Sequence, residues 1–101
     1  MIGRIWVGKV LLINRNEFVE YIKQTGLPGL KETAGNLGVQ IFIKDFETFS
    51  QIMIISFWDS IGSIMNFTGP DYTEARLYPD DQKYLTGTEP VVHYEVLIKD
   101  C

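Results

Sequence analysis

The sequence predicts a single α+β domain over residues 1–101, of the ferredoxin-like, split βαβ type. Three observations support this prediction. Apolar residues alternate in four segments, as strands do, and two other segments show the i, i+3, i+4 spacing of amphipathic helices. The resulting order is strand, helix, strand, strand, helix, strand. A chain of 101 residues also has the size of one domain.

The first strand and the first helix occupy the N-terminal part of the chain. Residues 2–13 carry apolar side chains on both faces, so we predict a strand that is buried on both sides. Asn14 or Asn16 caps the following helix, which ends at Gly26. The inner face of this helix is formed by Phe18, Tyr21, Ile22 and Thr25. We expect a further short turn of helix over residues 27–33.

A hairpin and a second helix follow. Residues 39–44 and 51–58 are predicted to be two strands joined by a short link, and the second of them is again apolar on both faces. Asp59 or Ser60 caps the next helix, and Gly69-Pro70 ends it. The inner stripe of that helix is predicted to be Ile61, Ile64, Met65 and Thr68.

The last third of the chain predicts one more helix and the closing strand. Asp71-x-x-Glu74 has the spacing of a capping box, so we expect a helix that ends before Pro79. A helical turn over residues 80–85, a loop over 86–90 and a strand over 91–98 complete the domain.

The predicted sheet is antiparallel and four-stranded, with its first and third strands central, because right-handed crossovers require this order. Helices cover only one face of such a sheet. The other face carries more large apolar side chains than a monomer normally exposes. We therefore predict a homodimer in which this face packs against the same face of a second copy.

Composition excludes several classes of partner. The formal net charge is −4 and the basic residues are scattered, which argues against a nucleic-acid partner. No apolar stretch is long enough to span a membrane. The single cysteine, Cys101, allows no internal disulfide, and its simplest interpretation is a terminal thiol without a role. No signal peptide is recognisable, so we expect a cytoplasmic location.

No strong catalytic motif is present. The glycines do not form a phosphate-binding loop, and no pair of Cys or His residues has the spacing of a zinc site, so no metal is expected. Trp58 ends the third strand, Arg4 and Trp6 share one face of the first, and His93 and Glu95 share one face of the last. Since the first and last strands are neighbours, Arg4 is placed to pair with Glu95.

Three further residues, Tyr72, Arg76 and Tyr78, are predicted to roof a cavity between the sheet and the helices. Each candidate also has a purely structural interpretation. The simpler interpretation of Trp58 is an anchor of the core where a strand meets a helix, and that of His93 is a core or interface residue whose hydrogen bonds are satisfied. Arg4 would then be a structural ion pair. Asp80-Asp81 reads as a solvated acidic pair at a helix start.

The run IISFWDS from Ile54 to Ser60, followed by an amphipathic helix through Phe67, resembles the third strand and second helix of the antibiotic biosynthesis monooxygenase family. Residues 1–6 and 92–96 are similar to the ends of an uncharacterised branch of that family. The resemblance implies a dimeric α+β barrel with a pocket between sheet and helices in each subunit. Some members of the family oxidise aromatic polyketides with O₂ and without metal or flavin, others degrade haem, and others have no known activity. The resemblance implies one of these three cases.

Few of the family's functional residues are matched. Trp58 stands where aromatic-oxidising members have a pocket tryptophan, but their asparagine and tyrosine positions hold Ile54 and Ile64. Arg76 lies near, but not at, their arginine position. Where haem-degrading members have a tryptophan and a histidine ligand, this chain has Phe67 and Leu77.

Two main hypotheses follow. The first is a cofactor-independent monooxygenase acting on a small aromatic or quinol, with His93 as base and with Arg4, Trp58 and Arg76 positioning the substrate or stabilising its anion. In this hypothesis Trp6, Tyr72 and Tyr78 contribute to substrate binding. The second hypothesis is a small-molecule-binding or stress-associated dimer without turnover. A third, weaker hypothesis is a haem-binding or haem-degrading protein.

Overall fold

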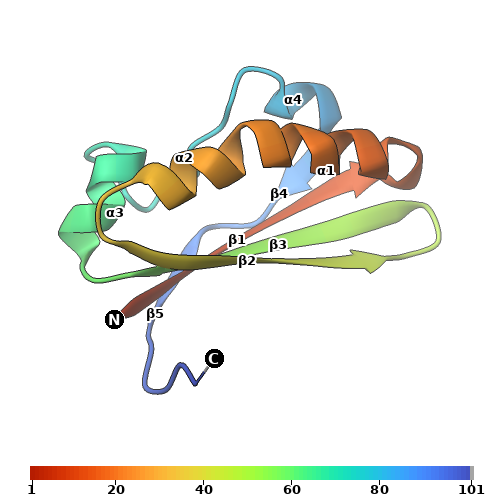
Figure 1. The fold of residues 1–101 in the computed structure, drawn as a ribbon. Helices are drawn as coiled ribbons and strands as arrows, with labels where there is room; N and C mark the ends of the chain where they lie inside the picture. Colours follow the sequence, from red (N-terminus) through yellow and green to blue (C-terminus); the bar gives the residue numbers. More distant parts are fainter. Residues whose placement is uncertain (101) are drawn as a thin grey trace.

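A computed structural model describes residues 1–100 and shows an antiparallel sheet with helices on one of its faces (Figure 1). Cys101, expected to be a thiol without a role, lies outside the described residues. The strands are β1 (Ile2–Leu11), β2 (Asn36–Asp45), β3 (Phe49–Trp58), β4 (Leu85–Thr88) and β5 (Val92–Glu95). The helices are η1 (Leu12–Asn14, a 3₁₀ turn), α1 (Arg15–Gln24), α2 (Gly26–Glu32), α3 (Ile61–Thr68) and α4 (Asp81–Tyr84).

The sheet has the order β2-β3-β1-β4, and β5 also pairs with β1. All of its strand pairs are antiparallel. The longest ladder joins β1 to β3 along their full length, from Ile2 opposite Trp58 to Leu11 opposite Phe49. The α+β fold and the central position of the first and third strands are therefore confirmed.

The closing part of the sheet differs from the prediction. Two short strands, β4 and β5, replace the single strand expected over residues 91–98, and β4 lies in the segment 86–90 that we predicted to be a loop. Pro90 separates them because proline has no N–H for a ladder hydrogen bond. The N–H of Glu89 donates to the Val7 carbonyl at 3.0 Å, which keeps the intervening segment beside β1.

The core lies between the sheet and the helices and has two buried clusters. One contains Val10, Phe18, Ile22 and Ile52, and the other contains Leu30, Trp58, Ile64 and Phe67. Ser60 is the cap of α3, because its Oγ accepts the N–H of Ser63 at 3.1 Å. The predicted inner stripe of α3 was wrong at Met65, which is exposed, since Phe67 fills that side of the helix instead.

Residues 69–80, which we call the strap, form no helix, so the predicted helix after Asp71 was wrong. The Asp71 carboxylate accepts hydrogen bonds from the N–H and hydroxyl of Thr73, which makes a local turn. Arg4 donates hydrogen bonds to the carbonyls of Tyr72 and Glu74. A helix would need those carbonyls for its own N–H groups, so the tertiary contacts of Arg4 compete with helix formation.

The sheet face opposite the helices is apolar, and most of its side chains are partly buried or exposed. Side chains alternate along a strand, so Ile5 points away from Arg4 and Trp6, which face the helices. Phe42 and Tyr94 are 54% and 56% exposed. The same face carries Met53, Ile55, Phe57 and Val92. Its packing against a second copy stays a prediction. Across residues 1–100, none of the helices combines the length and apolar character that crossing a membrane requires.

Candidate functional site

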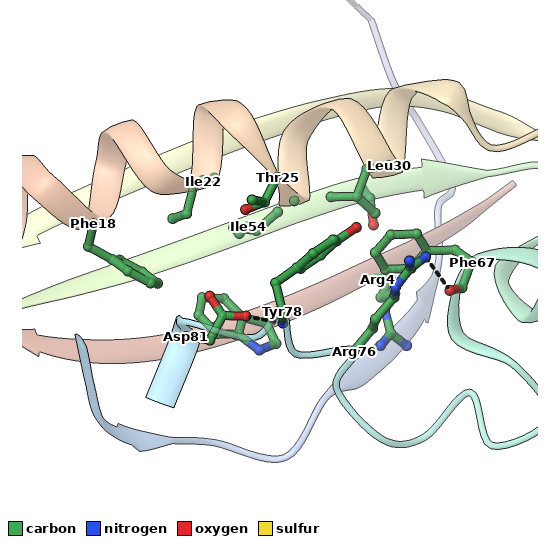
Figure 2. A pocket seen from close by; sticks show the side chains of 13 residues that line it. Arg4, Phe18, Ile22, Thr25, Leu30, Ile54, Phe67, Arg76, Tyr78 and Asp81 are labelled. Atoms are coloured by element: carbon green, nitrogen blue, oxygen red, sulfur yellow. Dashed lines mark hydrogen bonds between the residues drawn. The ribbon is translucent and has the colours of Figure 1, made fainter. Parts of the chain in front are cut away.

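A cavity lies between the sheet and the helices, under the strap (Figure 2). It offers about 60 Å³ of space to the centres of water molecules. That is less than the roughly 150 Å³ of a cavity known to hold a benzene ring. A single-ring ligand therefore fits only if one wall moves. The lining residues are Arg4, Trp6, Phe18, Ile22, Thr25, Gly26, Leu30, Ile54, Ser56, Phe67, Arg76, Tyr78 and Asp81.

Arg4 is a buried cation in the wall of this cavity, with only 4% of its surface exposed. Its Nη1 donates to the Tyr72 carbonyl at 2.5 Å and its Nη2 to the Glu74 carbonyl at 3.0 Å. Among residues 1–100, the ion pairs join Arg15 to Asp45 and Lys23 to Glu20, so no carboxylate balances Arg4. Burial lowers the pKa of its guanidinium to about 10, which leaves it charged at neutral pH.

His93 holds Arg4 from the neighbouring strand. The two residues are opposite each other in the β1–β5 ladder, and Arg4 Nη1 lies 2.9 Å from His93 Nε2. Because a guanidinium can only donate, Nε2 accepts and the ring is neutral with its proton on Nδ1. Burial and the charge of Arg4 lower the pKa of His93. The predicted pairing of Arg4 with Glu95 was wrong, since Glu95 lies opposite Ile2.

The strap closes the cavity with two side chains. Arg76 donates to the Phe67 carbonyl at 3.0 Å and lies over the rings of Phe67 and Tyr78, at 4.9 and 5.0 Å from their centroids. Tyr78 packs against α2, where a Cβ on Gly29 would collide with its hydroxyl. That hydroxyl is buried without a hydrogen-bond partner, and burial raises its pKa. The Tyr78 side chain is therefore a wall that can move without breaking a side-chain hydrogen bond.

Asp81 is the carboxylate of the cavity, and sequence reasoning missed it. Asp81 is 7% exposed, whereas its neighbour Asp80 is exposed. The prediction that both carboxylates are solvated was therefore wrong for Asp81. Its Oδ2 accepts the N–H of Tyr78 at 2.6 Å. Burial, and to a lesser extent the charge of Asp80, raises its pKa. Its place at the start of the helical turn predicted over residues 80–85 suggested a solvated carboxylate, and no local pattern indicates burial.

The two tryptophans have different surroundings. Trp6 lines the cavity, and a Cβ on Gly8 would lie 2.5 Å from its ring, so only glycine leaves room for it there. Trp58 is 0% exposed and belongs to the core beneath the cavity. Its indole N–H donates to Ser56 Oγ at 2.8 Å, which gives that buried group its partner.

The predicted site residues therefore fall into three groups. Arg4, Trp6, Arg76 and Tyr78 line one cavity. His93 and Tyr72 lie behind Arg4, with the Tyr72 ring edge-on to the imidazole at 5.3 Å, and neither lines the cavity. Trp58 lies in the core. Within residues 1–100, no cluster of three His, Cys, Asp or Glu side chains is arranged to hold a metal ion.

No family model and no curated protein matches the chain. Its structure does match solved structures over nearly its whole length. One is a provisionally assigned antibiotic biosynthesis monooxygenase from Bacillus cereus, with a TM-score of 0.68, 12% identity and coverage of 99% of this chain and 96% of that one. Another is the haem degrader MhuD from Mycobacterium tuberculosis, solved with two haems in its active site. It matches with a TM-score of 0.66, 18% identity and coverage of 100% of both chains.

A third is an uncharacterised NIPSNAP domain protein from Burkholderia xenovorans, with a TM-score of 0.68, 16% identity and coverage of 99% of this chain and 100% of that one. The chain has the fold of these proteins. The resemblance seen in the sequence is thus confirmed at the level of the fold.

Proposed function

We propose that the cavity binds a small single-ring phenol or quinol as its anion, and that the protein oxidises this anion with molecular oxygen. The observation that carries the proposal is Arg4, a buried guanidinium in a cavity wall without a carboxylate partner. A buried charge is costly unless it is paired. The carbonyls that Arg4 contacts supply only partial negative charge, so a bound anion would complete the site.

The walls favour a flat apolar body. Trp6, Phe18, Ile54 and Phe67 surround the space beside Arg4, and aromatic walls of this kind stack against a ring. The limited volume of the cavity favours a single ring over a porphyrin. The only histidine, His93, is already engaged by Arg4, which also disfavours haem.

The proposed reaction needs no redox group other than the substrate and O₂. A quinol anion gives two electrons on conversion to the quinone and two more when a ring C–H carbon becomes C–OH. One oxygen atom is retained in the hydroxyquinone, and the other leaves as water. The site would hold the anion in a dry environment and stabilise its charge through Arg4, which is the usual way such reactions are accelerated. The similar fold of a provisionally assigned monooxygenase supports this choice.

Arg4→Gln tests the proposal, with Arg15→Gln as the matched control, because Arg15 forms an exposed ion pair with Asp45 away from the cavity. Loss of a charge-assisted hydrogen bond predicts that Arg4→Gln weakens binding of 4-nitrophenolate by about tenfold or more, while Arg15→Gln does not. Hydroquinone should be converted to hydroxyquinone with uptake of one O₂ per turnover. Equal binding by both variants, or no binding by the wild type, would overturn the proposal.

A binding protein without turnover is the second candidate. The observation that favours it is the contact of His93 Nε2 with Arg4, since the lone pair expected to act as base is already in use. This candidate predicts Arg4-dependent binding of the phenolate with no oxygen uptake above the rate in buffer.

We also propose that the sheet face opposite the helices forms a homodimer, because Phe42, Val92 and Tyr94 are exposed on it in a single chain and Ile5, Met53, Ile55 and Phe57 are only partly buried. Phe42 is 54% exposed at the middle of β2 and serves as the probe. Phe42→Asp should convert a dimer into a monomer in light scattering, whereas Lys44→Asp on the same strand face, nearer its end, should weaken the dimer less. A wild-type monomer at micromolar concentration would contradict this proposal.

A further inference from the structure

We infer that Asp81 is the base of this site, and that it accepts the proton of a hydroxyl on the opposite side of the ring from the anion at Arg4. This inference rests on the proposed function and narrows its substrate class to para-quinols. In Figure 2, Asp81 lies on one side of Tyr78, and Arg4 lies on the other side together with Arg76, whose guanidinium is 5.0 Å from the centroid of the Tyr78 ring. A ring that takes the place of Tyr78 would therefore have a cation at one end and a carboxylate at the other.

The other candidates for the base are less suitable. His93 does not line the cavity, and its Nε2 accepts from Arg4. Tyr78 lines the cavity, but its buried hydroxyl is a weaker acceptor than a carboxylate, and burial disfavours its ionised form. Among the residues that line the cavity, Asp81 is the one with a carboxyl group.

A structural role does not account for Asp81 by itself. Its contact with the Tyr78 N–H closes the turn before α4, and the neutral side chain of Asn or Ser would serve that contact equally well. A carboxylate at 7% exposure carries a desolvation cost that such a cap avoids. The hydrogen bond to Tyr78 occupies Oδ2, which leaves Oδ1 for a ligand.

The charges around Asp81 are suited to proton transfer. Besides Asp81, the ionisable groups that line the cavity are Arg4 on β1 and Arg76 and Tyr78 on the strap. Asp80 is adjacent to Asp81 in the chain, and Tyr21 on α1 accepts the Asp80 N–H at 2.9 Å. From α1 itself, the cavity receives the apolar Phe18 and Ile22. Burial makes the carboxylate a stronger proton acceptor, and the bound anion at Arg4 would do the same.

The test compares Asp81→Asn with Asp80→Asn, which removes the adjacent exposed carboxylate. Binding is measured anaerobically with hydroquinone and with 4-methoxyphenol, which lacks the second hydroxyl. Asp81→Asn should weaken hydroquinone binding by about tenfold and leave 4-methoxyphenol unchanged, because only the diol reaches the carboxylate. The kcat for hydroquinone oxidation should fall by about a hundredfold or more. Asp80→Asn should change all three measurements far less, because Asp80 contributes only a smaller part of the rise in the pKa of Asp81.

The pH profile separates a base from a structural residue. Because the base must be ionised, kcat of the wild type should fall as the pH drops through the raised pKa of Asp81, and Asp81→Asn should lack this step. Asp81→Glu should restore part of the rate. The inference is overturned if Asp81→Asn keeps the wild-type preference for hydroquinone, even where Arg4-dependent binding holds. Loss of all binding in the wild type would instead remove the proposed function and this inference with it.

Discussion

The domain has two crossovers on one face of the sheet, and they are stabilised differently. The first half contains the crossover from β1 to β2, residues 12–35, and the second half contains the crossover from β3 to β4, residues 59–84. In the first half, α1 and α2 run nearly end to end and bury Phe18, Ile22 and Leu30 against the sheet (Figure 1). In the second half, α3 is followed by the strap, which is held by side-chain hydrogen bonds from Arg4 and Arg76 to main-chain carbonyls. The first crossover is stabilised by apolar packing along both helices, whereas in the second the apolar packing of α3, through Ile64 and Phe67, is followed by polar contacts along the strap. The cavity lies where the second crossover leaves the sheet less tightly covered.

The largest expected effect is that of Arg4→Met on the strap. This change leaves the Tyr72 and Glu74 carbonyls without their donor, at about 1–3 kcal/mol for each group that stays buried. We expect faster amide hydrogen exchange across residues 69–80 and little change in the β1–β3 ladder. Arg15→Met, which breaks an exposed ion pair, should cost under about 1 kcal/mol. Uniform destabilisation of both halves would contradict the difference between them.

A pair of glycine substitutions tests the contact between α2 and Tyr78. A Cβ on Gly29 would collide with the Tyr78 hydroxyl, whereas one on Gly26 would lie 3.9 Å from its ring, an ordinary contact. Gly26→Ala should stabilise the domain by about 0.5–1 kcal/mol in thermal unfolding. Gly29→Ala should lose that gain, expel Tyr78 and raise the affinity for a single-ring phenol. Equal stabilisation by both would show that Tyr78 does not close the cavity.

Trp58→Phe tests whether the core beneath the cavity can change without changing the site. The substitution keeps an aromatic ring and removes the hydrogen bond to Ser56, so we expect a loss of about 1 kcal/mol in denaturant unfolding. Phenol affinity and kcat should stay within a few-fold of the wild type. A large fall in kcat with little loss of stability would instead give Trp58 the catalytic role that the sequence predicts.

The smallest effect is expected from the pH dependence of His93. Its folded-state pKa is lowered, so the unfolded chain binds its proton more readily. Stability from this group is therefore complete above the unfolded pKa of about 6.5 and is lost as the pH falls toward the lower folded value. The loss between pH 7 and pH 5 should be larger in the wild type than in His93→Asn, whose amide oxygen can still accept from Arg4. The same loss in both proteins would exclude this linkage.

The same contrast explains which parts of the fold the sequence predicts. β1, β3, α1 and α3 have periodic apolar residues, and they form within a few residues of the predicted bounds. The strap has a capping-box pattern at Asp71 but is extended, because Arg4 takes the carbonyls that a helix would use. Local pattern carries no information about a donor that is 68 residues away in the chain.

The site was predicted in part for the same reason. The alternation of β1 placed Arg4 and Trp6 on one face. Tyr72, Arg76 and Tyr78 were expected to roof a cavity from a helical segment; Arg76 and Tyr78 line the cavity from the non-helical strap, and Tyr72 does not. The register of β5 could not be read from residues 91–98, since the break at Pro90 shifts which side chain meets Arg4. The burial of Asp81 depends on the path of the strap, which no pattern near Asp81 encodes.

The most direct test of the central claim is the side-chain ¹⁵N resonance of Arg4 during a titration. We predict that 4-nitrophenolate shifts the guanidinium signal, whereas the neutral methyl ether 4-nitroanisole binds without that shift. The Arg15 signal serves as an internal control and should not move with either compound. An unmoved Arg4 signal, or the same shift with both compounds, would contradict the assignment of Arg4 as the anion-binding group of the cavity.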